Sequence, residues 1–200
     1  MSEFFASLLT FALVSTISPG GATTLVTASG AQFGYMRSIP LMSGIAAGLA
    51  SLIGAAALGL GSITQLIPHL ELILRIVGSL YFLWLAWTIG RQAAPGTRTG
   101  IDANPIGFGA GFLLLWANPK GWTMAISSAS SFGRLADTPA ALAALLAIVF
   151  GLSAALSLSL WCTGGVWLAR SIRPDAGWRW RILNVTLAAL LVASIALLWL

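Results

Sequence analysis

The sequence predicts an all-α integral membrane protein in which six transmembrane helices form two inverted three-helix repeats, with helices 1 and 4 broken. Three observations carry this prediction. Hydrophobic residues make up 58% of the chain and charged ones 8%, and the mean hydropathy is +0.93. Long uncharged runs alternate with short polar segments. Two similar helix-breaking tetrads lie at equivalent places in the two halves of the chain.

The charge content excludes a soluble domain, since such a domain covers its surface with about 25% charged residues. The net charge of +5 would also suit a nucleic-acid partner, but the basic residues stand singly or at the ends of apolar runs and form no basic face. We therefore expect a lipid bilayer and no nucleic acid as partner. Cys162 is the single cysteine, which excludes a disulfide within the chain and favours a small buried thiol.

A helix needs about 20 apolar residues to cross the hydrocarbon core. The uncharged runs give six predicted spans, at residues 4–29, 39–66, 70–90, 106–131, 140–169 and 181–200. The segments between them are too short for a soluble domain, so residues 1–200 form a single transmembrane domain. It divides into a first repeat (1–92), a linker (93–105) and a second repeat (106–200). The first apolar stretch is too long for a signal peptide and is assigned to the first span.

The distribution of arginine predicts the orientation. The segments after spans 1, 3 and 5 contain Arg37, Arg91, Arg98, Arg170, Arg173, Arg179 and Arg181, whereas the opposite side has Arg134 alone clearly in a loop. Positively charged loops stay in the cytoplasm. Both termini are therefore expected on the outer side.

Two glycine pairs have the spacing that lets membrane helices approach closely. Gly44 and Gly48 lie in span 2, and Gly107 and Gly111 in span 4. Helix packing is the favoured interpretation for both pairs, and the same faces would permit a homodimer.

Spans 1 and 4 each contain a helix-breaking tetrad. These are Ser18-Pro19-Gly20-Gly21 and Asn118-Pro119-Lys120-Gly121, and Thr23 and Thr123 follow at the same offset. Proline removes a backbone donor and clashes with the preceding turn, so each tetrad opens or kinks its helix. Because a repeat of three spans is odd, the second copy crosses the membrane in the opposite direction. Inverted repeats with broken helices point to a transport site near the midplane.

The electrostatics of the two breaks predict what such a site would bind. Half-helices beginning near Ala22 and Trp122 would expose unpaired N–H groups with partial positive charge, and Lys120 adds a full charge. Together they suit a carboxylate, while Ser18, Asn118 and unwound carbonyls suit an ammonium. The candidate substrate-binding residues are Ser18, Pro19, Gly20, Gly21, Thr23, Asn118, Pro119, Lys120, Gly121 and Thr123. The alternatives are prolines that only kink packed helices and a lysine that snorkels to the interface.

These motifs resemble the LysE/RhtB family of bacterial amino-acid exporters. The resemblance runs along the whole chain, through Ser18-Pro19-Gly20, the Gly44 and Gly48 pair, residues 78–87, Asn118-Pro119-Lys120 and Asn184. It implies a multi-pass protein of the bacterial inner membrane, with both termini periplasmic on the orientation above. It also implies proton-driven export of amino acids or close derivatives along a path lined by the two breaks. Gly21 departs from the family pattern, which usually has a second proline there.

The other function classes need residues that this chain lacks. A membrane enzyme would need a nucleophile with a base, paired carboxylates or metal ligands, yet the chain has one His, one Cys and five widely spaced acids. We therefore expect no enzyme, no catalytic residue, no metal site and no cofactor. The alternatives to amino-acid export are export of another small solute, such as a cation or metal, by a related fold, and a non-transporting membrane assembly protein.

Overall fold

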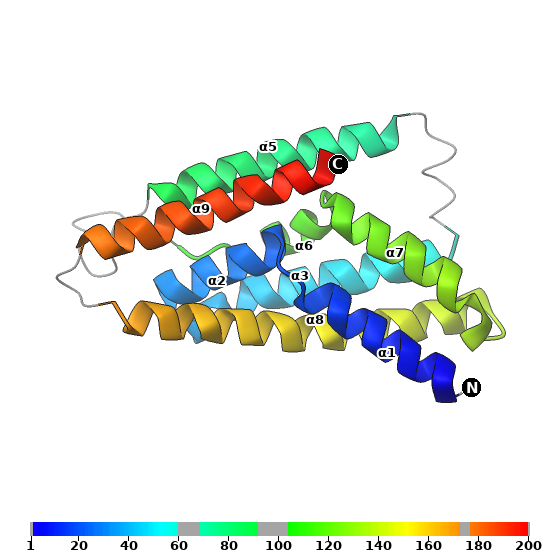
Figure 1. Cartoon of the computed structure of the whole chain (residues 1–200). Coiled ribbons are helices and arrows are strands. Elements are labelled where there is room, and N and C mark those ends of the chain that lie inside the picture. The colour runs from blue at the N-terminus through cyan, green and yellow to red at the C-terminus, as the bar shows by residue number, and fades with distance from the viewer. Residues whose placement is uncertain (1, 60–68, 92–103, 173–176, 200) are drawn as a thin grey trace.

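The computed structural model describes residues 2–59, 69–91, 104–172 and 177–199 (Figure 1). All regular structure in these residues is helical, which confirms the all-α prediction. The helices are α1 (Ser2–Ile17), α2 (Gly21–Phe33), α3 (Tyr35–Ala57), α5 (Leu70–Gly90), α6 (Phe108–Trp116), α7 (Pro119–Phe132), α8 (Pro139–Arg170) and α9 (Gly177–Trp199), with a 3-10 turn at Gly133–Leu135.

Three helices of the described residues are long and apolar enough to cross a membrane: Tyr35–Ala57, Pro139–Arg170 and Gly177–Ala196. The pair α1 and α2 counts as a fourth span if its 58° bend is allowed. These three or four spans are fewer than the six predicted. The difference arises because α6 and α7 have only 9 and 14 residues, and because the apolar part of α5 is limited to Arg75–Gly90. The end of predicted span 2 and residues 93–103 of the linker lie outside the described residues.

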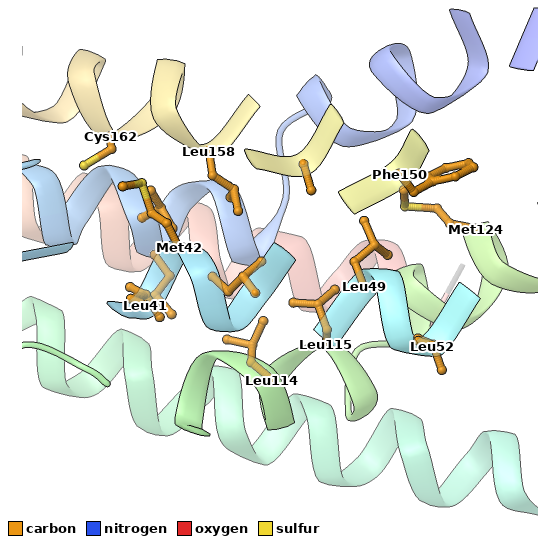
Figure 2. Close-up of a cluster of buried hydrophobic side chains, with 14 of the residues drawn as sticks. Leu41, Met42, Leu49, Leu52, Leu114, Leu115, Met124, Phe150, Leu158 and Cys162 are labelled. Carbon is orange, nitrogen blue, oxygen red and sulfur yellow. The ribbon is translucent and has the colours of Figure 1, made fainter. Parts of the chain in front are cut away.

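The helices form two layers (Figure 1). In the larger layer α3 contacts α8, α6 and α7, and α8 contacts α1 and α2. The pair α5 and α9 lies side by side along the other face and reaches the first layer through α2 and α7. Buried side chains from α3, α6, α7 and α8 fill the space between these helices, as Figure 2 shows for Leu49, Leu115 and Met124.

Close contact between α3 and α6 depends on glycine. A Cβ atom on Gly44 would overlap the carbonyl oxygen of Phe108, and one on Gly111 would lie 2.6 Å from the carbonyl oxygen of Leu41. Gly48 faces α6 in the same way. The packing prediction is confirmed for these three residues and is wrong for Gly107, since no atom of the described residues lies within 4 Å of such a Cβ there. Because the confirmed glycines face a helix of their own chain, they offer no surface for a homodimer.

A second close crossing joins α2 to α8, and the sequence analysis did not identify it. A Cβ atom on Gly165 would overlap the carbonyl oxygen of Thr27, and one on Gly30 would overlap that of Cys162. Cys162 itself is fully buried, as expected. The crossing holds the second half of α2 against the last third of α8.

The helix ends that carry most arginines lie at one end of the molecule. Figure 1 shows α2, α5 and α8 ending there and α3 and α9 beginning there. Three arginines at this end lie over aromatic rings: Arg37 is 5.8 Å from the ring centre of Phe33, Arg91 is 4.8 Å from that of Trp87, and Arg179 is 5.2 Å from that of Trp178. Cation–π contacts of this kind suit a membrane–water interface, where aromatic residues form belts.

The outward face of α8 is a continuous apolar stripe. Ile148, Leu152, Leu156 and Leu160 recur at every fourth position and are 54% to 69% exposed. Exposing such a stripe to water would cost free energy, whereas lipid hydrocarbon can surround it without this cost. The stripe therefore agrees with a helix that faces lipid.

Candidate functional site

The first break separates α1 from α2 by three residues. α1 ends at Ile17, and α2 begins at Gly21, one residue before the expected start. Pro19 cannot continue the hydrogen-bond pattern of α1, which explains the interruption. The Thr23 hydroxyl stabilises the start of α2 through two hydrogen bonds with Gly20. It accepts one from the Gly20 N–H at 2.9 Å and donates one to the Gly20 carbonyl at 2.9 Å.

The second break has a different local structure. α6 ends at Trp116, and Asn118 caps α7 by accepting a hydrogen bond from the Lys120 N–H at 3.0 Å. Pro119 occupies the first turn of α7, where a missing N–H costs nothing. The half-helix therefore begins at Pro119 rather than near Trp122, and the Asn118 side-chain oxygen is engaged in the cap. Lys120 lies in the first turn of α7.

The two breaks meet through Lys120. Its ammonium nitrogen donates hydrogen bonds to the Ser18 hydroxyl at 2.6 Å and to the Ser18 carbonyl at 3.2 Å. The Ser18 hydroxyl in turn donates to the carbonyl of Ser15 at 2.9 Å. Within the described residues no carboxylate contacts this ammonium. A cation without an acidic partner is expensive inside a membrane. The contact joins residues 102 positions apart.

The carbonyls of Thr16, Ile17 and Ser18, where α1 ends, each accept a hydrogen bond from a side chain. The Ser157 hydroxyl donates to the Thr16 carbonyl at 2.8 Å, and the Trp161 indole donates to the Ile17 carbonyl at 3.0 Å. Lys120 supplies the third donor, to Ser18. These carbonyls lose their helical partners where the helix stops. The sequence analysis missed both donors from α8, although the polar or aromatic residues at every fourth position, Ser153, Ser157 and Trp161, carry a recognisable signal.

A cavity of about 50 Å³ lies between the breaks, enough for a few water molecules. Seven predicted site residues line it: Ser18, Gly20, Gly21, Thr23, Asn118, Lys120 and Gly121. Pro19, Pro119 and Thr123 are not among its lining residues. Thr123 is exposed, and its hydroxyl donates to the Pro119 carbonyl at 3.1 Å.

The remaining wall of the cavity is mostly apolar. It includes Ile45, Leu49, Leu115, Met124 and Leu158, four of which are labelled in Figure 2. These residues come from α6 and α7, which flank the second break, and from α3 and α8, which the sequence analysis did not connect with the breaks. Gly21 borders the site on another side, where the ring of Phe82 lies so close that a Cβ atom on Gly21 would overlap it.

The arrangement offers complementary charges at short range. The N–H groups of Gly21, Ala22 and Thr23 have no carbonyl to pair with inside α2, and all three residues line the cavity. They provide the positive end of a helix dipole, and the end of α1 at Ser18 provides the negative end of another. A zwitterion is the kind of solute that matches such a pair. The described residues contain no group of three His, Cys, Asp or Glu that would hold a metal ion.

A second cavity, of about 470 Å³, lies at the arginine-rich end of the molecule. Its lining residues come from α2 and α5, from Arg91 directly after α5, and from Asn104 and Ile106. This cavity and the one between the breaks are both bordered by residues of α2.

Comparison with known proteins gives a match over nearly the whole chain. Residues 13–199 match the family model described as LysE type translocator. A protein of Salmonella paratyphi A named cysteine/O-acetylserine efflux protein is 31% identical over 192 residues, which cover 92% of this chain and 91% of that protein. Proteins of the same name from Escherichia coli K12 (29% over 189 residues, covering 92% and 91%) and Klebsiella pneumoniae (31% over 128 residues, covering 64% of each) are also similar. No solved structure matches the chain.

Proposed function

Because this chain belongs to the LysE type translocator family, we propose that it exports a small amino acid with an uncharged side chain, of the cysteine or O-acetylserine class. The chain is a multi-pass membrane protein and a transporter rather than an enzyme. The observation that carries the proposal is the contact of Lys120 with Ser18, which joins the two breaks at a common cavity.

The lining of that cavity supports the choice of solute. Lys120 carries the positive charge of the site, and no carboxylate of the described residues lies against it to receive a cationic side chain. The apolar wall formed by residues such as Leu49, Leu115 and Leu158 suits a short, uncharged side chain. The relatives named for cysteine and O-acetylserine efflux point to the same class.

We propose that the ten residues predicted from the two tetrads form the substrate path, with unequal roles. Ser18, Gly21 and Lys120 would contact the solute directly, since they line the cavity. Pro19 and Pro119 would shape the breaks without touching it. Thr23 and Asn118 would hold the starts of α2 and α7 through the caps that they form.

We further propose the six-span arrangement with two inverted repeats, of residues 1–92 and 106–200 joined by the linker. In this arrangement α1, α2, α3 and α5 correspond to α6, α7, α8 and α9. The helix contacts support it, since α7 lies against α3 as α2 lies against α8, and α6 lies against α3 as α1 lies against α8. The corresponding helices α3 and α8 contact each other, as do α5 and α9.

The orientation proposed for the bacterial inner membrane places both termini in the periplasm. We expect a fluorescent reporter that matures only in the cytoplasm to stay dark when it is fused after residue 200. The same reporter fused after Arg91, at the arginine-rich end, should be bright because basic residues are retained in the cytoplasm. Whole-cell fluorescence, corrected for the amount of fusion protein, measures both. A bright C-terminal fusion would show that the orientation is reversed.

The transport proposal predicts that inside-out membrane vesicles containing this protein accumulate labelled L-cysteine and O-acetylserine. Accumulation should exceed that of control vesicles without the protein and should stop when a protonophore collapses the proton gradient. L-lysine should accumulate far less, because its second ammonium would face Lys120 inside a poorly solvated site. Vesicles that accumulate none of these amino acids, or that prefer L-lysine, would contradict the proposal.

A further inference from the structure

We propose that Ser18 forms the ammonium subsite of the transport site, and that Lys120 fills this subsite as a tethered cation until the exported amino acid displaces it. This inference rests on the proposed function and goes beyond it, because it assigns separate partners to the two charged groups of the solute. It also gives Lys120 two successive positions.

The first step concerns the carbonyls at the end of α1. Those of Thr16 and Ile17 accept hydrogen bonds from neutral groups of α8, the Ser157 hydroxyl and the Trp161 indole. Ser15, Thr16 and Ser18 all line the cavity. The carbonyls of Ser15 and Thr16 already accept from the Ser18 and Ser157 hydroxyls, whereas both oxygens of Ser18 accept from the Lys120 ammonium. Ser18 therefore carries the acceptor groups that become available to a solute when Lys120 moves. Cations are stabilised at the negative end of a helix dipole.

The second step is a match of chemical groups. The Lys120 ammonium is a compact cation with three donors, and so is the α-ammonium of an amino acid. Its nitrogen lies 2.6 Å from the Ser18 hydroxyl oxygen and 3.2 Å from the Ser18 carbonyl oxygen. The structure thus already shows this acceptor pair binding the group that the solute would present.

The third step is the displacement. Two ammonium groups cannot share these two acceptors, because like charges a few ångströms apart repel strongly in a poorly solvated site. The four-carbon stem of lysine lets the Lys120 ammonium move without a change in α7. Gly20 borders this ammonium without a side chain, since a Cβ atom there would lie 3.5 Å from the nitrogen. The displaced ammonium would stay in the cavity that Gly21 and Ala22 also line, where it could pair with the solute's carboxylate.

This exchange makes a specific prediction for cysteamine, which is cysteine without its carboxylate. In the wild type, cysteamine must displace Lys120 and offers no carboxylate in return. Lys120→Gln removes the tethered competitor, so cysteamine should bind at least about threefold more tightly to the variant. The gain should disappear in the Ser18→Ala/Lys120→Gln double variant, which also lacks the hydroxyl of the subsite. Arg134→Gln, which removes a charge from an exposed site, should leave the affinity unchanged.

Affinities are measured on full-length protein in lipid nanodiscs under reducing conditions. Unchanged or weaker binding of cysteamine by Lys120→Gln would overturn the inference. A gain that survives loss of the Ser18 hydroxyl would do the same, since it would reflect general charge repulsion rather than competition for this subsite. If Lys120→Gln does not fold, Lys120→Met provides the same comparison.

A comparison on the wild type alone needs no variant. N-acetylcysteine lacks the ammonium group and should bind at least about tenfold more weakly than L-cysteine. Equal binding of the two would overturn the subsite. If L-cysteine binds but the cysteamine result is negative, only this inference fails and the proposed function stands. If L-cysteine and O-acetylserine neither bind nor move in vesicles, the proposed function fails and the inference falls with it.

Discussion

Replacing Lys120 with glutamine is expected to reduce amino-acid export by at least about 100-fold, while the protein still reaches the membrane. The change removes the charge but keeps a polar side chain of similar length. It removes the charged group whose contact with Ser18 joins the two breaks. It also removes the full positive charge beside the proposed carboxylate position. A tenfold change in affinity corresponds to about 1.4 kcal/mol, so a 100-fold loss requires two such steps.

The effect should appear in transport and not in stability. A buried lysine without an acidic partner is costly in the bilayer, so its neutral replacement should leave the amount of folded protein unchanged or raise it. Initial rates in inside-out vesicles, normalised to the amount of transporter, give the measurement. Arg134→Gln removes a positive charge from an exposed position in the turn after α7 and is the matched control. Export by Lys120→Gln at the wild-type rate would remove Lys120 from the transport mechanism.

The second large effect is expected from a single methyl group at the crossing of α2 and α8. In Gly165→Ala the new Cβ would overlap the carbonyl oxygen of Thr27 and lie 3.1 Å from the Ala31 nitrogen. Both are backbone atoms, so relief requires one helix to move away from the other. Overpacking of this kind typically costs about 1–3 kcal/mol. Because α2 carries the N–H groups that line the cavity, the displacement should also impair export.

The neighbouring glycine provides a closely matched control. Gly164 lies in the same helix and is exposed, and no atom in the described part of the chain lies within 4 Å of an added Cβ. Gly164→Ala should be neutral or stabilising, because alanine is favoured over glycine inside a helix by up to about 1 kcal/mol. Thermal unfolding midpoints in the same detergent measure both variants. Equal midpoints for the two would show that α2 and α8 do not cross as closely as the structure indicates.

Local patterns in the chain were sufficient for the helical class and for the two interruptions. Pro19 and Pro119 lie near glycine in two matching tetrads, and this pattern predicted where α1 and α6 would give way to new helices. A proline alone is not sufficient, since Pro40 lies inside α3. The exact first residues of α2 and α7 could not be predicted from the prolines. Asn118 caps α7 with its own side chain, which allows the helix to begin at Pro119 and puts Lys120 in its first turn.

The glycine motifs show why spacing alone is a weak guide to packing. Gly44 and Gly107 occupy equivalent places in two small-xxx-small pairs, yet only Gly44 lies against a neighbouring backbone. The close contact of Gly165 with Thr27 was not found, because no pattern in the sequence pairs α8 with α2. A glycine is required only where the backbone of another helix packs against it. The sequence of one helix does not show which other helix that is.

The sequence by itself determined that the chain is helical, apolar and interrupted twice, and that its arginines gather at alternate connections. These properties follow from residues that are adjacent or one helical turn apart. Only the tertiary structure decided that Lys120 reaches Ser18 and that Ser157 and Trp161 complete the end of α1. Those contacts join residues more than a hundred positions apart. They exist because carbonyls freed by one helix break must find donors on whichever helices pack beside it.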